Sequence, residues 1–340
     1  MKAARYYGPE NIKIEEIPIP EPGAGEIIVK NKVALTCGTD VKIYTRGYPL
    51  FKPPFIFGHE ASGIVYKAGD GVTAFKTGDS VVAHNSAPCN SCYYCKQGQQ
   101  SMCVNAIFNL GAFSEYQRIS AQIVKQNVFH IPEGMSFKDA ALTEPFSCAV
   151  YGVSEIGIEA GDTVVINGAG PIGLMFTRLA YFRGAKIIVT DLCDERLEAA
   201  KKMGASVVIN ARDCTDIVGI VKNHTDDGRG ADVSIEAVGL PSTWESTVLM
   251  ARKGGRVLLF GGTKSGSSFT IDTTLLHYSQ LTIKGVFHTT PKYVQKAFNL
   301  IKNGMISAED FVGASYPLEK LEEALLEHKQ GKVIKNCIVF

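Results

Sequence analysis

Hydrophobic residues in the first 145 or so positions fall into short runs that alternate with polar residues and end at glycine or proline. Four such runs cover residues 12–22, 25–36, 61–69 and 78–84. Alternation with a period of two, bounded by turn residues, is typical of β-strands. This part of the chain is therefore predicted to form an irregular, mostly β domain with long loops.

The pattern changes near residue 150, where β-type runs begin to alternate with helical stretches. The expected strands lie at residues 163–167, 186–191, 206–210, 231–239, 256–262 and 281–286. The expected helices lie at residues 171–185, 194–205 and 242–253. Asp194 is a plausible N-cap for the second helix, and Gly184 and Gly204 are expected to end the first two. Strands that alternate with helices indicate a parallel sheet with helices on both faces.

The last part of the chain contains two further helical stretches, at residues 292–304 and 318–332, and a strand at 336–340. Because this tail follows the last strand of the parallel sheet, we expect it to rejoin the first domain. The predicted fold class is α/β. It comprises a discontinuous, mostly-β domain of residues 1–147 and 286–340 and a doubly wound parallel-sheet domain of residues 148–285.

Composition narrows the classes of function. Of the 340 residues, 45% are hydrophobic and 20% are charged, which is typical of a soluble globular protein. The net charge of +1 argues against a strong electrostatic attraction to nucleic acid or to an anionic membrane. No apolar run approaches the roughly 20 residues that a membrane helix needs, and the N-terminus lacks the apolar core of a signal peptide. We therefore expect a cytoplasmic protein without nucleic-acid or membrane partners.

A glycine-rich turn joins the strand at 163–167 to the helix at 171–185. It reads Gly168-Ala169-Gly170-Pro171-Ile172-Gly173, which matches G-x-G-x-x-G in a strand–turn–helix context. The three glycines of this motif allow a tight turn, a close approach of the backbone to a pyrophosphate and close packing of helix on strand. The helix N-terminus then faces the anion. The turn predicts a dinucleotide site.

Asp191 ends the next strand, 18 residues after Gly173. A carboxylate at this place accepts hydrogen bonds from the adenosine ribose and repels a 2′-phosphate, so NAD is favoured over NADP. Arg196 lies one turn into the following helix. It could stack on adenine or remain a solvated helix charge.

Four of the nine cysteines lie within residues 87–103. Cys89, Cys92, Cys95 and Cys103 have the spacing C-x2-C-x2-C-x7-C, which predicts a closed tetrahedral zinc site in a lobe of about residues 86–105. A disulfide framework is disfavoured in a reducing cytosol, and an iron–sulfur cluster is the other metal alternative. Four thiolates leave no position for a substrate, so this site is expected to be structural.

A second set of metal donors is dispersed along the chain. It comprises Cys37, His59, Glu60 and Glu144. Each has an alternative interpretation as a buried thiol, a packed histidine or a carboxylate at a helix start. In combination they offer the sulfur, nitrogen and oxygen donors of a catalytic zinc with an exchangeable position.

The order of these motifs resembles one enzyme family. CGTD at 37–40, GHE at 58–60, the four-cysteine lobe, EP at 144–145, GAGPIG at 168–173 and Asp191 resemble the zinc-dependent medium-chain dehydrogenases. Glu144 in the EP motif resembles the polyol (sorbitol-type) and threonine dehydrogenase branch. The resemblance implies a GroES-like catalytic domain and a Rossmann domain, about two zinc ions per chain, and a homodimer or homotetramer.

The resemblance also implies roles for individual residues. Cys37 and His59 would bind zinc directly, and Glu60 and Glu144 would bind it directly or through water. Asp40 would orient His59, and Thr39 would begin the proton path. A zinc-bound alkoxide of a secondary alcohol, from a polyol, a sugar or a phosphate of either, would then give hydride to NAD⁺.

Two positions depart from the family pattern. Lys42 stands where many relatives have a proton-relaying histidine, and with Arg46 it could bind an anionic substrate. His288 lies where polyol dehydrogenases carry an Arg-Tyr pair. These three residues are the candidate substrate contacts.

L-threonine 3-dehydrogenase activity is the alternative enzyme activity. A non-catalytic zinc-ribbon protein that binds nucleic acid is a remote alternative, because the four-cysteine lobe offers only Lys96 as a nearby cation.

Overall fold

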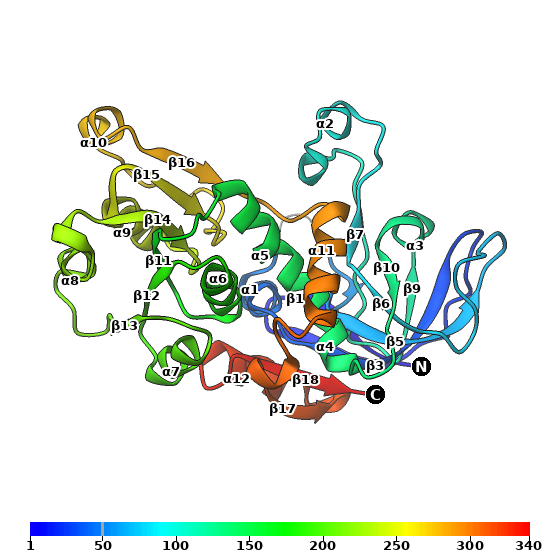
Figure 1. The fold of residues 1–340 in the computed structure, drawn as a ribbon. Coiled ribbons are helices and arrows are strands. Elements are labelled where there is room, and N and C mark those ends of the chain that lie inside the picture. Colours follow the sequence, from blue (N-terminus) through cyan, green and yellow to red (C-terminus); the bar gives the residue numbers. More distant parts are fainter. Residues whose placement is uncertain (49–50) are drawn as a thin grey trace. The chain divides into compact units, whose positions relative to one another are not determined.

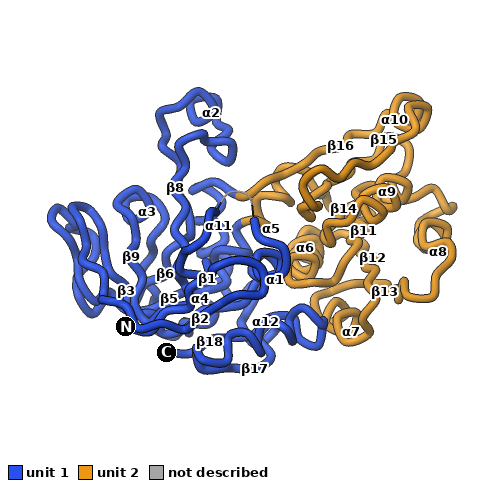
Figure 2. The backbone as a smooth tube through the Cα atoms, turned by 180° about the vertical axis from the view of Figure 1, so that it is seen from behind, with its two compact units in different colours: residues 1–147, 289–340 blue, residues 148–288 orange. Residues whose placement is uncertain are grey.

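The computed structural model describes residues 1–48 and 51–340. Its contacts divide the chain into two compact units, shown in different colours in Figure 2. Unit 1 comprises residues 1–147 and 289–340, and unit 2 comprises residues 148–288. Unit 1 is therefore built from both ends of the chain.

Unit 2 is formed around a six-stranded sheet in which every pair of neighbours is parallel. The strand order is β13-β12-β11-β14-β15-β16. The strands are β11 Thr163–Asn167, β12 Lys186–Asp191, β13 Val207–Asn210, β14 Ala231–Glu236, β15 Ala251–Leu259 and β16 Thr282–Gly285. β11 is buried at every position, as a strand covered on both faces must be. From β11 the chain forms β12 and then β13 towards one edge of the sheet. It then crosses to β14, on the other side of β11, and continues to the opposite edge. The strand order therefore reverses between β11 and β14.

Helices cover both faces of this sheet (Figure 1). α6 connects β11 to β12, and α7 connects β12 to β13. α8 precedes β14, and α9 connects β14 to β15. Because these later connections run across the sheet in the opposite direction with the same handedness, α8 and α9 lie on the opposite face. The helices of unit 2 are α6 Pro171–Phe182, α7 Asp194–Lys202, α8 Ile217–Asn223, α9 Pro241–Met250 and α10 Thr273–Tyr278, with a 3-10 turn η2 Asp226–Gly228. The α/β class expected from the sequence is confirmed.

Unit 1 is mostly β. Its largest sheet has the order β10-β6-β5-β3-β18-β17, and β9 also pairs with β3. Smaller sheets have the orders β2-β1-β4 and β7-β8. The strands are β1 Lys2–Gly8, β2 Asn11–Glu16, β3 Ile27–Leu35, β4 Phe55–Ile56, β5 Ala61–Ala68, β6 Ser80–Ala83, β7 Ser86–Ala87, β8 Ile107–Phe108, β9 Tyr116–Ile119, β10 Val128–His130, β17 Val312–Pro317 and β18 Lys335–Val339.

The C-terminal segment is part of the unit 1 sheet. β18 pairs antiparallel with β3, through Cys337 opposite Leu35, and parallel with β17. The helices of unit 1 are α1 Gly38–Arg46, α2 Tyr93–Lys96, α3 Ala121–Asn127, α4 Phe137–Ala141, α11 Pro291–Lys302 and α12 Leu321–Lys329, with 3-10 turns η1 Gln100–Met102, η3 Ala308–Asp310 and η4 Leu318–Lys320. α5 Thr143–Ile156 runs from unit 1 into unit 2.

Two local expectations were wrong. The helix expected at 242–253 ends at Met250, and residues 251–253 begin β15, because the chain must return to the sheet to pair with β14. Asp194 is the first helical residue of α7 and not its N-cap, a position that Cys193 occupies. No helix in the described ranges is long and apolar enough to cross a membrane.

Candidate functional site

Cys37 stands where β3 gives way to α1. Its backbone is extended, and its Sγ accepts a hydrogen bond from the Thr39 N–H at 3.4 Å, so Cys37 is the N-cap of α1. Asp40 completes a reciprocal cap, because its Oδ2 accepts a hydrogen bond from the Cys37 N–H at 3.0 Å. The cap fixes the Cys37 side chain at the N-terminus of α1.

His59 lies just before β5 and is buried beside Asp40. Its Nδ1 lies 2.9 Å from Asp40 Oδ1. Burial is the largest single influence and lowers the pKa of His59, but the charges and hydrogen bonds of Asp40 and Cys37 together raise that pKa well above its usual value. With Nδ1 directed at Asp40, Nε2 is the ring nitrogen available to a metal. Donor atoms of Cys37, His59 and Glu60 lie within 4.8 Å of one another, so the structure brings these three predicted residues together.

Glu60 has a partner that the sequence did not reveal. Lys335, on β18, is completely buried, and its Nζ donates hydrogen bonds to Glu60 Oε1 at 2.8 Å and Oε2 at 2.6 Å. The third bond goes to the Thr36 carbonyl at 2.9 Å. All three ammonium hydrogens are thus used. Burial alone would lower the pKa of Lys335, but the negative charge of Glu60 raises it, which is consistent with an ionised pair.

Glu144 lies in the first turn of α5 and is buried. Burial raises its pKa to about 7, against the opposing charge of His59 and with a further increase from Glu60. The charges that act on Glu144 are those of His59, Glu60, Lys335 and Asp40. Its carboxylate is nevertheless not one of the donors of the Cys37, His59 and Glu60 group, whose atoms all lie within 4.8 Å of one another. Of the four predicted metal donors, Glu144 lies farthest along the chain from Cys37.

A buried histidine supports the turn that carries Glu144. His84 is 1% exposed, and its Nδ1 accepts a hydrogen bond from the Ser86 N–H at 3.1 Å, so Nε2 carries the proton. That Nε2 lies 3.2 Å from Ser147 Oγ, which in turn donates to the Glu144 carbonyl at 2.7 Å. The sequence offered no motif for His84 or Ser147, because their partners are distant in the chain.

The predicted substrate contacts lie in two places. Thr39, Lys42 and Arg46 occupy positions i, i+3 and i+7 of α1 and therefore share one face, away from the buried Asp40 and Tyr44. This face begins beside the Cys37 thiol. His288 is the last residue of unit 2, has a positive φ of 60° and contacts the ring of Phe287.

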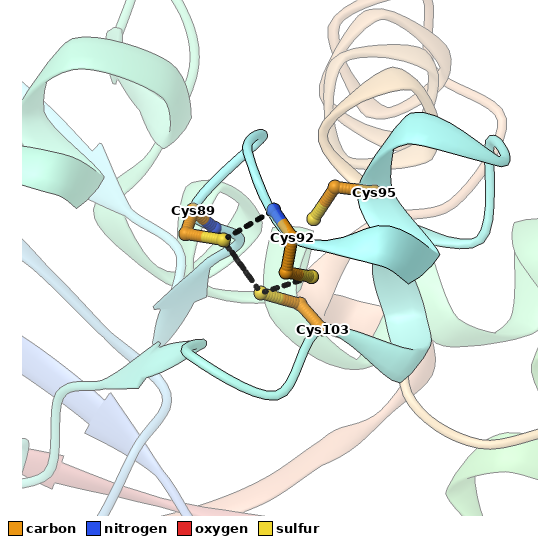
Figure 3. A group of neighbouring side chains, drawn as sticks. All are labelled: Cys89, Cys92, Cys95 and Cys103. Carbon is orange, nitrogen blue, oxygen red and sulfur yellow. Dashed lines mark hydrogen bonds between the residues drawn. The ribbon is translucent and has the colours of Figure 1, made fainter.

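The four-cysteine lobe folds around α2 and η1 (Figure 3). The sulfur atoms of Cys89, Cys92, Cys95 and Cys103 lie within 4.8 Å of one another, with Cys103 Sγ at 3.5 Å from Cys89 Sγ and 3.9 Å from Cys92 Sγ. All nine cysteines lie in the described ranges and are free of disulfides. Hydrogen bonds from the Ser91 hydroxyl and backbone lower the pKa of Cys89 to about 5.

These distances suit zinc. A tetrahedral zinc with thiolates at about 2.3 Å needs sulfur atoms about 3.8 Å apart, close to the two distances above. A disulfide would need them at about 2.0 Å. The donor set therefore fits a zinc ion. The structural role of this site stays a prediction.

The glycine-rich turn in unit 2 has the geometry that a dinucleotide requires. Gly168 has a φ of +110°, and a Cβ on Gly173 would lie 1.8 Å from the Gly168 carbonyl oxygen, so neither position accepts a side chain. A Cβ on Gly170 would meet open space within 4 Å. Gly170 is the N-cap of α6, with Pro171 at the first helical position, and the cap has no side-chain hydrogen bond. The helix terminus is thus open to an anion.

Asp191 joins this turn to the end of β12. Its Oδ2 accepts a hydrogen bond from the Ala169 N–H at 2.7 Å, and its Oδ1 accepts from the N–H groups of Leu192 and Cys193 at 2.8 and 3.0 Å. The carboxylate is therefore rigidly placed beside the turn. Arg196 is half-buried on α7, and its Nε is buried without a hydrogen-bond partner in the described residues.

Two family models match this chain. Residues 23–133 match the family "Alcohol dehydrogenase GroES-like domain", and residues 171–303 match the family "Zinc-binding dehydrogenase". The first match contains Cys37, His59 and the four-cysteine lobe. The second begins at Pro171, within the glycine-rich turn, and contains Asp191.

Individual proteins are similar over nearly the whole chain. Sorbitol dehydrogenase of Bacillus subtilis is 35% identical over 98% of this chain and 94% of its own length. D-xylulose reductase A of Aspergillus oryzae is 30% identical over 97% and 94%. Among solved structures, a Sinorhizobium meliloti protein assigned as a zinc-binding dehydrogenase and bound to NADP is 28% identical, with a TM-score of 0.92 and coverage of 100% and 99%.

Proposed function

Because the chain belongs to the zinc-dependent medium-chain dehydrogenase family, in its polyol dehydrogenase branch, we propose that it transfers hydride from a secondary alcohol to NAD⁺. The substrate class is a polyol, a sugar or a phosphate of either. The observation that carries the proposal is the gathering of the Cys37 thiol and the His59 imidazole, backed by Asp40, in a chain that also carries an open glycine-rich turn.

Cys37 Sγ and His59 Nε2 would hold the catalytic zinc, with a carboxylate as the third protein ligand. Zinc in such a site is a Lewis acid that polarises the oxygen of an alcohol and favours loss of its proton. Of the two carboxylates, Glu60 has both oxygens bonded to Lys335, so Glu144 is the better candidate for the third ligand. Lys335 would then act as the buried counter-ion that holds Glu60 in place.

The remaining chain residues of the site position the substrate and move its proton. Asp40 keeps the proton of His59 on Nδ1, so that Nε2 is directed at the metal. Thr39, on the exposed face of α1 next to Cys37, would relay the proton released by the alcohol, accepting it as its own hydroxyl proton passes to solvent. Lys42 and Arg46 extend that face with positive charge, which favours an anionic group such as a phosphate at the far end of the substrate.

The cofactor would occupy unit 2. Its pyrophosphate would lie on the N-terminus of α6, where Gly170 leaves room for it, and its adenosine ribose would lie near Asp191. A bound nicotinamide supplies the hydride acceptor. The fixed negative charge of Asp191 favours NAD, whereas the NADP in the Sinorhizobium meliloti structure makes NADP the alternative to be tested. The cytoplasmic location and the homodimer or homotetramer stay predictions.

Asp191→Asn should weaken NAD binding and relax discrimination against NADP. The substitution keeps the side-chain shape but removes the charge that would repel a 2′-phosphate. We expect the ratio of kcat/KM for NAD to that for NADP to fall about tenfold, corresponding to about 1.4 kcal/mol. Asp194→Asn, three residues away at the first position of α7, is the matched control and should leave the ratio unchanged. An unchanged ratio in Asp191→Asn would show that the carboxylate does not face the ribose.

The proposed function is tested by following NADH formation over a panel of substrates. The panel contains polyols, polyol phosphates, L-threonine and simple secondary alcohols. Turnover of a polyol or of its phosphate supports the proposal, and a preference for the phosphate assigns an anion-binding role to Lys42 and Arg46. Turnover of threonine alone would replace the polyol by the threonine dehydrogenase alternative.

A further inference from the structure

A buried carboxylate lies at the carboxyl end of β14. Glu236 is fully buried and accepts four side-chain hydrogen bonds. Oε1 accepts from the N–H groups of Val238 and Gly239 at 3.0 and 2.7 Å and from Thr243 Oγ1 at 2.6 Å. Oε2 accepts from the Gly261 N–H at 3.1 Å. One side chain thus satisfies donors from two loops, 237–240 after β14 and 260–262 after β15.

The two loops are packed against each other and against the glycine-rich turn. A Cβ on Gly261 would lie 2.4 Å from Gly239 N and 2.5 Å from Glu236 Oε2. A Cβ on Gly168 would lie 2.7 Å from Val238 Cγ2, so loop 237–240 borders the turn directly. Glu236 therefore holds these loops together at Gly239 and Gly261, two positions that have no side chain of their own.

The sheet topology says which part of a dinucleotide would meet these loops. Parallel sheets of this kind bind ligands outside the carboxyl ends of the strands, where the strand order reverses, which here is between β11 and β14. Asp191 ends β12, on the other side of β11, and marks the adenosine side. A dinucleotide whose pyrophosphate lies at Gly170 must extend its nicotinamide half over the ends of β14 and β15.

We propose that Glu236 is a positioning residue for the nicotinamide half of the cofactor, because it fixes loops 237–240 and 260–262 as the wall on which that half lies. The inference rests on the dinucleotide binding in the proposed function. Trp244, the only tryptophan of the chain, reports on this wall, since its Nε1 donates a hydrogen bond to the Gly261 carbonyl at 3.0 Å.

Glu236→Gln tests the proposal with little change of shape. An amide nitrogen cannot accept a hydrogen bond, so at least one loop N–H loses its acceptor. We expect the Kd for NADH to rise about tenfold, because a buried donor is left unsatisfied. The Kd for ADP, which covers only the adenosine side, should change by less than about twofold. Both constants are measured by calorimetry on the full-length protein, and Trp244 emission follows the loops.

Glu198→Gln is the matched control, because Glu198 is an exposed carboxylate of the same unit and pairs with Lys201. It should change neither Kd. An unchanged NADH affinity in Glu236→Gln, or equal losses for NADH and ADP, would overturn the positioning role. Failure of the wild-type protein to bind NADH at all would refute the proposed function, and this inference with it. If Glu236→Gln does not fold, Thr243→Val is the second variant. It removes the hydroxyl that donates to Glu236 and accepts from the Leu240 N–H, and should weaken NADH binding about threefold and spare ADP binding. Unchanged NADH affinity in this variant would overturn the role.

Discussion

Cys37→Ala is expected to lower turnover by about 10³-fold or more while leaving the fold and NADH binding intact. Zinc acting as a Lewis acid contributes several kcal/mol to the stabilisation of developing charge, and each 1.4 kcal/mol is tenfold in rate. Without the thiolate, the site keeps one strong ligand, His59. The measurements are kcat with the substrate found in the screen, zinc content by elemental analysis and NADH affinity. We expect about one zinc per chain in place of about two.

Cys103→Ala is the matched control for this experiment. It also removes one cysteine ligand and should also lower the zinc content by about one per chain, but from the structural lobe. The folded fraction of this variant should turn over at a rate near that of the wild type, because the lobe offers no open position for substrate. Full turnover in Cys37→Ala, or loss of turnover in Cys103→Ala without loss of fold, would contradict the division into one catalytic and one structural site.

Lys335→Met is expected to destabilise unit 1 by about 3–5 kcal/mol, because it leaves the buried carboxylate of Glu60 without its counter-ion. The expected loss of stability is large because both side chains of the pair are 0% exposed, so water cannot solvate the carboxylate that is left. The measurement is urea unfolding followed by far-UV circular dichroism with zinc in excess. In the double variant Glu60→Gln/Lys335→Met the buried charge is gone, so part of the lost stability should return.

Lys2→Met provides the comparison at the surface. Lys2 pairs with Glu319 at 2.6 Å, the same distance as Lys335 Nζ to Glu60 Oε2, but both side chains are about half exposed. Water screens such a pair, so its loss should leave the unfolding transition essentially unchanged. Equal effects of Lys2→Met and Lys335→Met, or a double variant as unstable as Lys335→Met alone, would show that the charge of Glu60 does not cause the destabilisation.

The parts of the site that could be predicted from the sequence are those whose residues lie close together along the chain. The glycine-rich turn spans six residues, and the four cysteines of the lobe span fifteen. In both, the local chain geometry brings the chemistry together, so spacing alone is informative. Cys37 and Asp40 are likewise joined by one helical cap.

The parts that the sequence did not reveal depend on pairing across the fold. Lys335 reaches Glu60 only because β18 pairs with β3, which joins residues 275 positions apart. His84 supports Glu144 through Ser147 across 63 positions. A lone lysine or histidine in an apolar run carries no signal of its partner. The same holds for Glu236, because three of its four partners are loop N–H groups that nearly every residue type could supply.

Local propensity also failed where tertiary structure decided the outcome. Residues 251–253 continue a helical pattern, yet they begin β15 because its strand partner β14 pairs with Ala251 through Ala231. Asp194 is a good N-cap by composition, but α7 begins one residue earlier than that role would require.

The central claim is that catalysis depends on a zinc bound through Cys37 and His59. It is tested most directly by stripping the protein with a chelator and restoring zinc in steps, with metal content and NADH formation measured on the same samples. We predict no turnover in the stripped protein, and turnover that rises to its full value only as zinc approaches about two per chain. Full turnover in the stripped protein, or at one zinc per chain in Cys37→Ala, would contradict the account.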